Sequence, residues 1–187
     1  MSPWSRLTVP PTETTGVLFR SLQQDTMPVF EREVRVSAPL EDVWEFHATA
    51  DGLVALTPDW MHLRVDETRG PDGDPDPAVL DTGAVIVSSM RPFGVAPRQR
   101  WVSEIVAREE GEAEAMFRDV MTEGPFPEWE HTHRFHAVSD LATVVHDRVV
   151  YELPGGALGR LAGPFGFVGM EPMFRYRHRK TREILEA

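Results

Sequence analysis

The segment GPFPEWEHTHRFH, residues 124–136, decides the fold class because its side chains alternate in character. Trp129, His131, His133 and Phe135 occupy every second position, with a polar or charged residue between each pair. A period of two is typical of a β-strand whose two faces differ. We therefore expect two imidazoles to lie on the same face of a strand as two aromatic rings.

A second alternating segment, residues 142–153, follows and places four residues on one face: Val145, Asp147, Val149 and Tyr151. If the loop near Ser139–Asp140 has an odd number of residues, His133 lies opposite Asp147 and Trp129 lies opposite Tyr151. An even loop would mix charged residues into both faces, so the pattern favours the odd loop. Two interpretations of the His133–Asp147 pair stay open: a polar pair satisfied within the core, or a pair that faces a ligand.

The segments around this hairpin predict the other elements. Residues 29–36 alternate as a strand, and Pro39 suits the first turn of a helix with an apolar stripe at Leu40, Val43, Trp44 and His47. A short helix is expected over 53–56, and further strands over 61–67, 82–90, 99–107 and 113–121. Residues 155–169 are expected to be a flexible, glycine-rich connection, and Pro172 to open a helix with Phe174, His178, Thr181 and Leu185 on one stripe.

This order of elements predicts the α+β class, with a curved antiparallel sheet of about seven strands wrapped around a long C-terminal helix. Residues 1–27 are expected to form a poorly ordered extension, and residues 28–187 a single domain. The basic residues of the last helix are interpreted as a solvated face: Arg175, Arg177, Arg179, Lys180 and Arg182.

Composition excludes several classes of function. The net charge of −11 argues against nucleic-acid binding, because phosphates would be repelled. The chain has no Cys, which excludes disulfides, thiolate nucleophiles and Cys-ligated metals, and a single Lys, Lys180, argues against a Schiff-base mechanism. No apolar run would span a membrane and no secretory signal is recognised, so we expect a cytoplasmic protein.

The spacing His131-x-His133 is the strongest metal signal, because two imidazoles two apart on a strand can share one cation. The Glu that would be expected to follow in a cupin-like motif is absent, so the sequence predicts no metal and no other cofactor. The alternative is a zinc or iron site in which Asp147 is the third ligand.

Three segments together resemble a known superfamily: GPFPEWEHTHRF, HDRVVYELP and FRYRHRK. They are similar to the ligand-binding branch of the START-like helix-grip (SRPBCC) superfamily, which includes polyketide cyclase/dehydrase-type proteins. VRVSAPLEDVWEFHA, LTPDW and RQRWVSEI are also similar, so the resemblance covers about residues 29–187. It implies a seven-stranded antiparallel sheet that grips the C-terminal helix around a deep hydrophobic cavity, and it implies no fixed catalytic set.

The residues and the resemblance lead to the same functional prediction: a small, mostly hydrophobic ligand, such as a lipid, a polyketide or an isoprenoid-like molecule, is held in an internal cavity. The expected apolar walls are Trp101, Trp129, Phe135 and Tyr151, and the expected polar contacts are His131, His133, Asp147 and His178. The alternative is a cyclase/dehydratase-type enzyme in which His133, oriented by Asp147, removes a proton alpha to a carbonyl. Neither prediction involves nucleic acid or stable membrane insertion.

Overall fold

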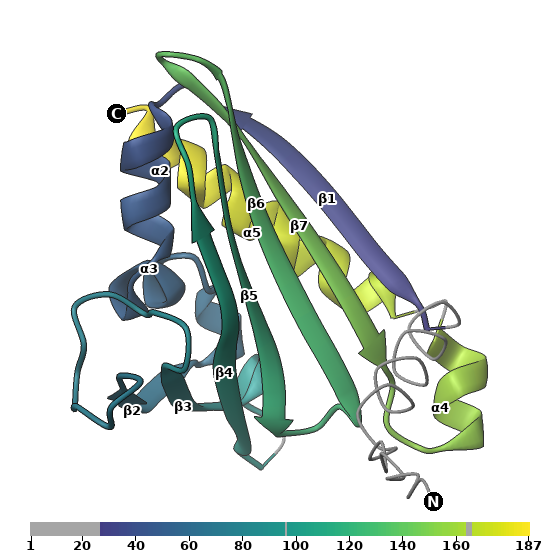
Figure 1. Ribbon diagram of the computed structural model, residues 1–187. Helices are drawn as coiled ribbons and strands as arrows, with labels where there is room; N and C mark the ends of the chain where they lie inside the picture. Colours follow the sequence, from purple (N-terminus) through teal and green to yellow (C-terminus); the bar gives the residue numbers. More distant parts are fainter. Residues whose placement is uncertain (1–26, 96, 164–165) are drawn as a thin grey trace, which may run out of the picture.

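The computed structural model describes residues 27–95, 97–163 and 166–187, so residues 1–26 of the expected extension lie outside the described residues. One sheet of seven antiparallel strands forms its centre, in the order β1-β7-β6-β5-β4-β3-β2 (Figure 1). The strands are β1 (Val29–Val36), β2 (Arg64–Arg69), β3 (Val85–Met90), β4 (Gln99–Glu110), β5 (Glu114–Glu123), β6 (Glu128–Ser139) and β7 (Ala142–Glu152). The α-helices are α2 (Leu40–His47), α3 (Ala50–Ala55), α4 (Ala157–Ala162) and α5 (Phe167–Leu185), and short 3-10 turns span η1 (Asp59–Met61) and η2 (Pro92–Gly94). The predicted fold class is confirmed.

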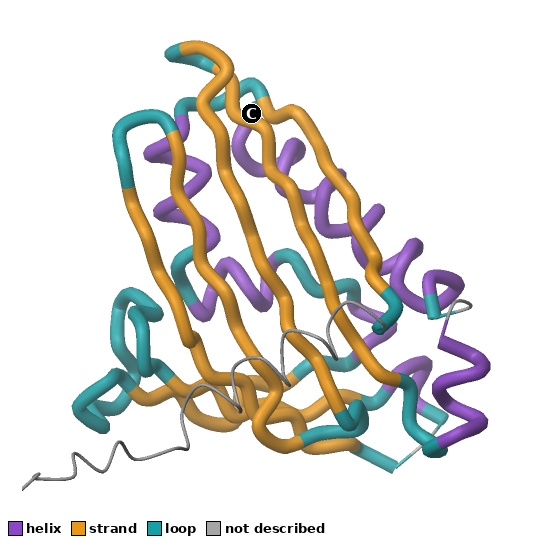
Figure 2. Tube along the Cα trace, turned by 45° about the vertical axis from the view of Figure 1, so that its right-hand side comes forward, coloured by secondary structure: helices purple, strands orange, loops and turns teal. Residues whose placement is uncertain are grey.

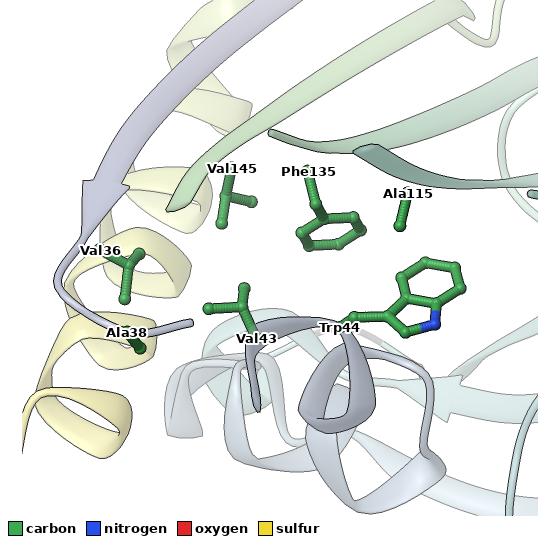
Figure 3. Packing of buried hydrophobic residues seen from close by; sticks show 7 residues of the cluster. All are labelled: Val36, Ala38, Val43, Trp44, Ala115, Phe135 and Val145. Atoms are coloured by element: carbon green, nitrogen blue, oxygen red, sulfur yellow. The ribbon is translucent and has the colours of Figure 1, made fainter. Parts of the chain in front are cut away.

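Helices α2 and α5 pack on the same face of the sheet, and the strands curve around them (Figure 2). The ring of Phe174 on α5 lies 5.0 Å from Phe30 of β1 and 5.2 Å from His131 of β6, measured between ring centroids. Trp44 on α2 packs edge-on against Phe135 of β6, with the ring centroids 5.5 Å apart. The contact of Trp44 with Phe135 belongs to an apolar cluster between α2 and the sheet (Figure 3). Its members are Val36, Ala38, Val43, Trp44, Ala115, Phe135 and Val145. The cluster packs α2 against the inner face of the sheet.

The pairing of β6 with β7 has the predicted register. His133 lies opposite Asp147, Phe135 opposite Val145, and Trp129 opposite Tyr151. The predicted odd loop is wrong, because the turn consists of two residues, 140 and 141. An irregularity between Ala137 and Ser139 adds one residue to β6 and restores the register. The burial of the apolar face therefore determines the register, and a bulge accommodates the even turn.

The last helix begins earlier than predicted. α5 starts at Phe167, so Pro172 lies inside the helix and removes one backbone hydrogen bond instead of opening it. The predicted stripe is confirmed at Phe174, His178 and Thr181, which are buried against the sheet. The glycine-rich stretch before α5 also contains a helix, α4, because Ala and Leu favour helix there once Gly155 and Gly156 have turned the chain with positive φ.

Two boundaries near the start of the sheet also differ from the predictions. The short second helix spans Ala50–Ala55, because the hydroxyl of Thr49 accepts a hydrogen bond from the Gly52 amide and begins the helix earlier. The strand expected over 61–67 is divided: Met61 ends η1, and β2 begins only at Arg64. His62, which has a φ of 47°, makes the break between them.

Tyr151 has a structural role at the end of β7. Its hydroxyl donates a hydrogen bond of 2.8 Å to the buried carbonyl of Gly163, just before α5. Its ring packs so closely on Gly166 that a Cβ there would lie 2.5 Å from a ring carbon. Tyr151 therefore connects β7 to the chain that leads into α5.

We predict that Tyr151→Phe lowers the free energy of unfolding by about 1–3 kcal/mol, because the Gly163 carbonyl stays buried without its donor. Denaturant unfolding monitored by circular dichroism measures this loss. Tyr176→Phe, on the half-buried side of α5, is the matched control and should cost less. Equal losses in both variants would show that the Tyr151 hydrogen bond contributes nothing specific.

Candidate ligand-binding site

A cavity of about 140 Å³ lies between the inner face of the sheet, α3 and α5. Most of its walls are apolar, and the apolar lining includes Leu53, Leu56, Ile86, Trp101, Ile105, Phe117, Trp129, Met173 and Phe174. Five ionisable side chains also line it: His47, Asp119, His131, His133 and Arg177. The cavity is therefore an apolar space with a group of ionisable residues in its wall.

The polar part of the wall is built by two neighbouring strands. His131 and His133 alternate on the inner face of β6, as predicted. Asp119 of β5 lies directly opposite His131 in the ladder, and Phe117 lies opposite His133. The imidazole and phenyl rings of His133 and Phe117 stack with their centroids 4.1 Å apart. The alternation of β5 and β6 thus brings one carboxylate and two imidazoles to the same wall.

Asp147 lies behind the two imidazoles and is 2% exposed. His131 Nε2 donates a hydrogen bond of 2.9 Å to Asp147 Oδ1, and His133 Nδ1 lies 2.8 Å from the same oxygen. On the other side, His178 Nε2 of α5 donates a hydrogen bond of 2.5 Å to Oδ2. One buried carboxylate therefore contacts three imidazoles, two from the sheet and one from the last helix.

The charges in this cluster follow from burial and proximity. Burial opposes ionisation of Asp147, but the charge of His133 and the three imidazole contacts outweigh it and hold the pKa of Asp147 well below its usual range. Burial also opposes a charge on His133, yet Asp147 and Asp119 raise its pKa above the usual value. Burial and the charge of His133 lower the pKa of His131 to about 4. At neutral pH the cluster therefore contains the charged carboxylate of Asp147 beside a neutral His131, and the environment of His133 favours its protonated form more than water does.

His47 and Arg177 contribute polar groups from two helices. His47 Nδ1 donates a hydrogen bond of 2.7 Å to the Val43 carbonyl, which leaves Nε2 as the acceptor nitrogen of a neutral ring. Burial lowers the pKa of His47 to about 3, so this ring is uncharged at neutral pH. Burial also lowers the pKa of Arg177, which Asp147 and Asp119 counteract. Since arginine starts from a pKa far above neutrality, Arg177 remains a cation in the cavity wall.

Four of the predicted ligand contacts line the cavity: Trp101, Trp129, His131 and His133. The other four lie outside its lining. Phe135 is fully buried against Trp44, Asp147 and His178 form the layer behind the imidazoles, and Tyr151 contacts the segment before α5.

Sequence reasoning missed three residues of the site: His47, Asp119 and Arg177. The sequence does contain a signal that Asp119 points inward, because it shares an alternating face with Ala115, Phe117 and Met121. Arg177 follows Phe174 by three positions on α5 and lines the cavity, so the prediction of a uniformly solvated basic face is wrong at this position. Arg175 and Arg179 do pair with acidic residues on the exposed side.

The chain matches one protein family in sequence and several solved structures in fold. The model described as polyketide cyclase/dehydrase and lipid transport matches residues 36–173. A search of curated proteins finds no match. Among the described residues, no helix is both long enough and apolar enough to cross a membrane.

Solved structures with the same fold are only distantly related in sequence. Norcoclaurine synthase from Thalictrum flavum, solved with dopamine and hydroxybenzaldehyde, is 14% identical, with 98% of each chain covered and a TM-score of 0.59. A protein from Thermus thermophilus is 20% identical, with coverage of 83% of this chain and 95% of the other and a TM-score of 0.57. The di-domain ARO/CYC of the BE-7585A biosynthetic pathway is 18% identical over 86% of this chain and 47% of its own, with a TM-score of 0.54. These similarities establish the helix-grip fold.

We predict that the two buried tryptophans differ in their contribution to stability. Trp44 packs on side chains, so Trp44→Ala should lower the free energy of unfolding by about 3–5 kcal/mol. Trp129 belongs to a buried apolar cluster but also lines the cavity, so part of its ring faces space instead of side chains, and Trp129→Ala should cost about 1–2 kcal/mol. Denaturant melts of both variants measure the difference. If Trp129→Ala were as destabilising as Trp44→Ala, Trp129 would be a core residue and no cavity wall.

We also predict that His47 makes the fold sensitive to acid. Its pKa is about 3 in the folded protein against an ordinary value of 6.5, so between these values the unfolded chain binds one more proton. Stability therefore falls on acidification, by about 1.4 kcal/mol between about pH 7.5 and about pH 5.5. His47→Phe should reduce the pH dependence of the free energy of unfolding by this amount. His146→Gln, on the outer face of β7, controls for the loss of an imidazole, and an unchanged pH dependence in His47→Phe would contradict the prediction.

Proposed function

Because the chain belongs to the polyketide cyclase/dehydrase and lipid transport family, we propose that it binds a compact, mostly hydrophobic molecule with a polar head in the internal cavity. One observation carries the proposal: an apolar cavity has a wall of ionisable groups that a buried carboxylate holds in place. Apolar walls with a few convergent polar groups are typical of sites for small molecules.

The size of the cavity favours a ring over a long chain. Its volume of about 140 Å³ is close to that of a cavity of about 150 Å³ that accepts benzene. Trp101 and Trp129 meet edge to face in its wall, with ring centroids 5.1 Å apart, and Phe117 adds another aromatic surface. Such walls suit a planar ring, because offset and edge-on aromatic contacts are favourable. A compact cyclic compound therefore fits better than an extended acyl chain.

The charges in the wall favour an acceptor group on the ligand. Arg177 is a cation, and Asp147 and Asp119 raise the pKa of His133 above its usual value, which favours its protonated form. Both can donate to a carbonyl, phenolate or carboxylate oxygen, and an arginine matches a carboxylate in bidentate geometry. We therefore propose a ligand with a cyclic apolar body and an oxygen-bearing head.

The proposal is tested first by native mass spectrometry of the purified full chain, which identifies any small molecule that remains bound. Titration with benzoate, benzaldehyde and octanoate, followed by quenching of tryptophan fluorescence, then measures affinity. We expect the two ring compounds to bind more tightly than octanoate. No bound molecule and no saturable quenching by any of the three would contradict the proposal, and conversion of an added compound would favour the cyclase/dehydratase alternative.

Two pairs of variants test the assigned contacts. Trp129→Ala should weaken benzoate binding by about tenfold or more, equivalent to about 1.4 kcal/mol, and Trp60→Ala is the control because Trp60 stacks on Phe93 outside the cavity lining. Arg177→Gln should weaken benzoate more than benzaldehyde, since only benzoate carries a charge. Arg179→Gln, on the same helix but paired with Glu183, should leave both affinities unchanged. Equal effects of Arg177→Gln and Arg179→Gln would remove Arg177 from the site.

A further inference from the structure

Three ligand-type atoms meet in the polar wall of the cavity. His131 Nδ1 lies 3.8 Å from Asp119 Oδ1, and His133 Nε2 lies 3.7 Å from the same oxygen. The ligand atoms of the three residues all lie within 4.8 Å of one another. We infer that Asp119, His131 and His133 bind one divalent transition-metal ion at the wall of the cavity.

The opposite nitrogen of each imidazole supports this inference. His131 Nε2 donates a hydrogen bond of 2.9 Å to Asp147, and His133 Nδ1 lies 2.8 Å from the same carboxylate oxygen. In a neutral imidazole, the nitrogen that faces a carboxylate carries the proton and the other presents its lone pair. The two lone-pair nitrogens are then the two that face Asp119. A carboxylate behind metal-binding histidines is common in metalloproteins, because it sets the tautomer and the ring orientation.

The distances are close to those of a bound site. Histidine nitrogens and carboxylate oxygens bind Zn²⁺ at about 2.0–2.2 Å, which places two ligands of a tetrahedral ion about 3.3 Å apart. The observed separations from Asp119 exceed this by a few tenths of an ångström. Small rotations about the side-chain bonds of Asp119 would shorten these two distances, and rotations of the imidazoles would bring their nitrogens, which lie within 4.8 Å of each other, to the same spacing.

The ligand set selects the class of ion. Two imidazoles and one carboxylate match catalytic zinc and non-haem iron(II), whereas Mg²⁺ and Ca²⁺ prefer oxygen ligands alone. All three residues line the cavity, so further coordination positions would face the space where a small molecule binds. The class is therefore a borderline divalent ion such as Zn²⁺ or Fe²⁺ with positions open towards the cavity.

The charge of the wall is also favourable. Metal ligation requires neutral imidazoles, and the cluster then contains the two carboxylates Asp119 and Asp147. Among the described residues that line the cavity, Arg177 is the one cationic side chain with a permanent charge. Counted over Asp119, Asp147 and Arg177, this part of the site then carries one more negative than positive charge, and a divalent ion would offset it. The sequence predicts no metal because the Glu of a cupin-like motif is absent after His131-x-His133, and its alternative makes Asp147 the third ligand. In the structure Asp119 supplies a carboxylate from the adjacent strand, while Asp147 lies behind the imidazoles.

The inference is tested with the metal alone and does not depend on the proposed function. The full chain, without a histidine tag, is treated with a chelator, dialysed and titrated with Zn²⁺ by calorimetry and with Co²⁺ by visible absorption. We expect one ion per chain, and a visible spectrum that indicates a Co²⁺ ion of low coordination number. Mg²⁺ should neither bind with comparable affinity nor displace Co²⁺.

Four variants assign the ligands. Asp119→Asn and His133→Ala should each weaken Zn²⁺ binding at least about tenfold, and Asp147→Asn should weaken it by about 10–100-fold through the orientation of the imidazoles. His136→Ala removes an imidazole of the same strand that has a partly exposed side chain and should leave the affinity unchanged. Zn²⁺ should raise the thermal midpoint of the wild type and not that of Asp119→Asn.

Asp119→Asn is nearly isosteric, so it decides the question if His133→Ala or Asp147→Asn does not fold. Its own fold is checked by comparing its melting midpoint with that of the metal-free wild type. Absence of stoichiometric binding to the wild type, an unchanged affinity in folded Asp119→Asn, or an equal loss in His136→Ala would each overturn the site. Binding of benzoate to the metal-free chain would still be measurable in any of these cases.

Discussion

The buried carboxylate of Asp147 is the contact on which the arrangement of sheet and helix depends. Removing a carboxylate from water costs roughly several kcal/mol, and partners must offset this cost. Here His131 and His133 approach one side from β6, and His178 approaches the other from α5. A rotation or a shift of α5 by one residue would separate His178 from Asp147 and leave a buried charge with fewer contacts. This requirement adds to the apolar packing of Phe174 in fixing the position of α5 along the sheet.

The same contact gives the cavity its character. Because Asp147 is shared by the imidazoles, His131 and His133 cannot turn freely, and their remaining nitrogens face β5. The apolar walls come from long strands and from α3 and α5. The chemistry of the site is thus concentrated on two adjacent strands, while the other elements supply shape. This division is consistent with a fold that carries several functions on one scaffold.

The fold was largely predictable because alternation is a strong local signal. The faces of β6 and β7 follow from period two, and burial of one apolar face fixes His133 opposite Asp147. The bulge before Ser139 was not predictable. A two-residue turn with a bulge and a three-residue turn without one give the same register, and the alternation of side chains indicates only the register. Pro172 led to a wrong predicted start for α5, because a proline suits the first turn of a helix but is tolerated further along this one.

The composition of the cavity wall was predicted only in part. Strand faces can be assigned from sequence, but the curvature of the sheet determines which inward residues line the cavity and which pack against a helix. Tyr151 and Trp129 share a face and nevertheless have different surroundings for this reason.

The strand order has a consequence for how the chain folds. Strands β2 to β7 form a meander in which each strand pairs with its neighbour in sequence, but β1 pairs with β7, so Val29 meets Val150 across most of the domain. Closing such a distant pair is entropically costly and slow compared with forming hairpins. We therefore expect the first strand and the last helix to complete the domain late, after the polar wall on β5 and β6 has formed. On this order of folding the wall would be open to solvent until α5 docks, and a ligand or an ion could enter at that stage.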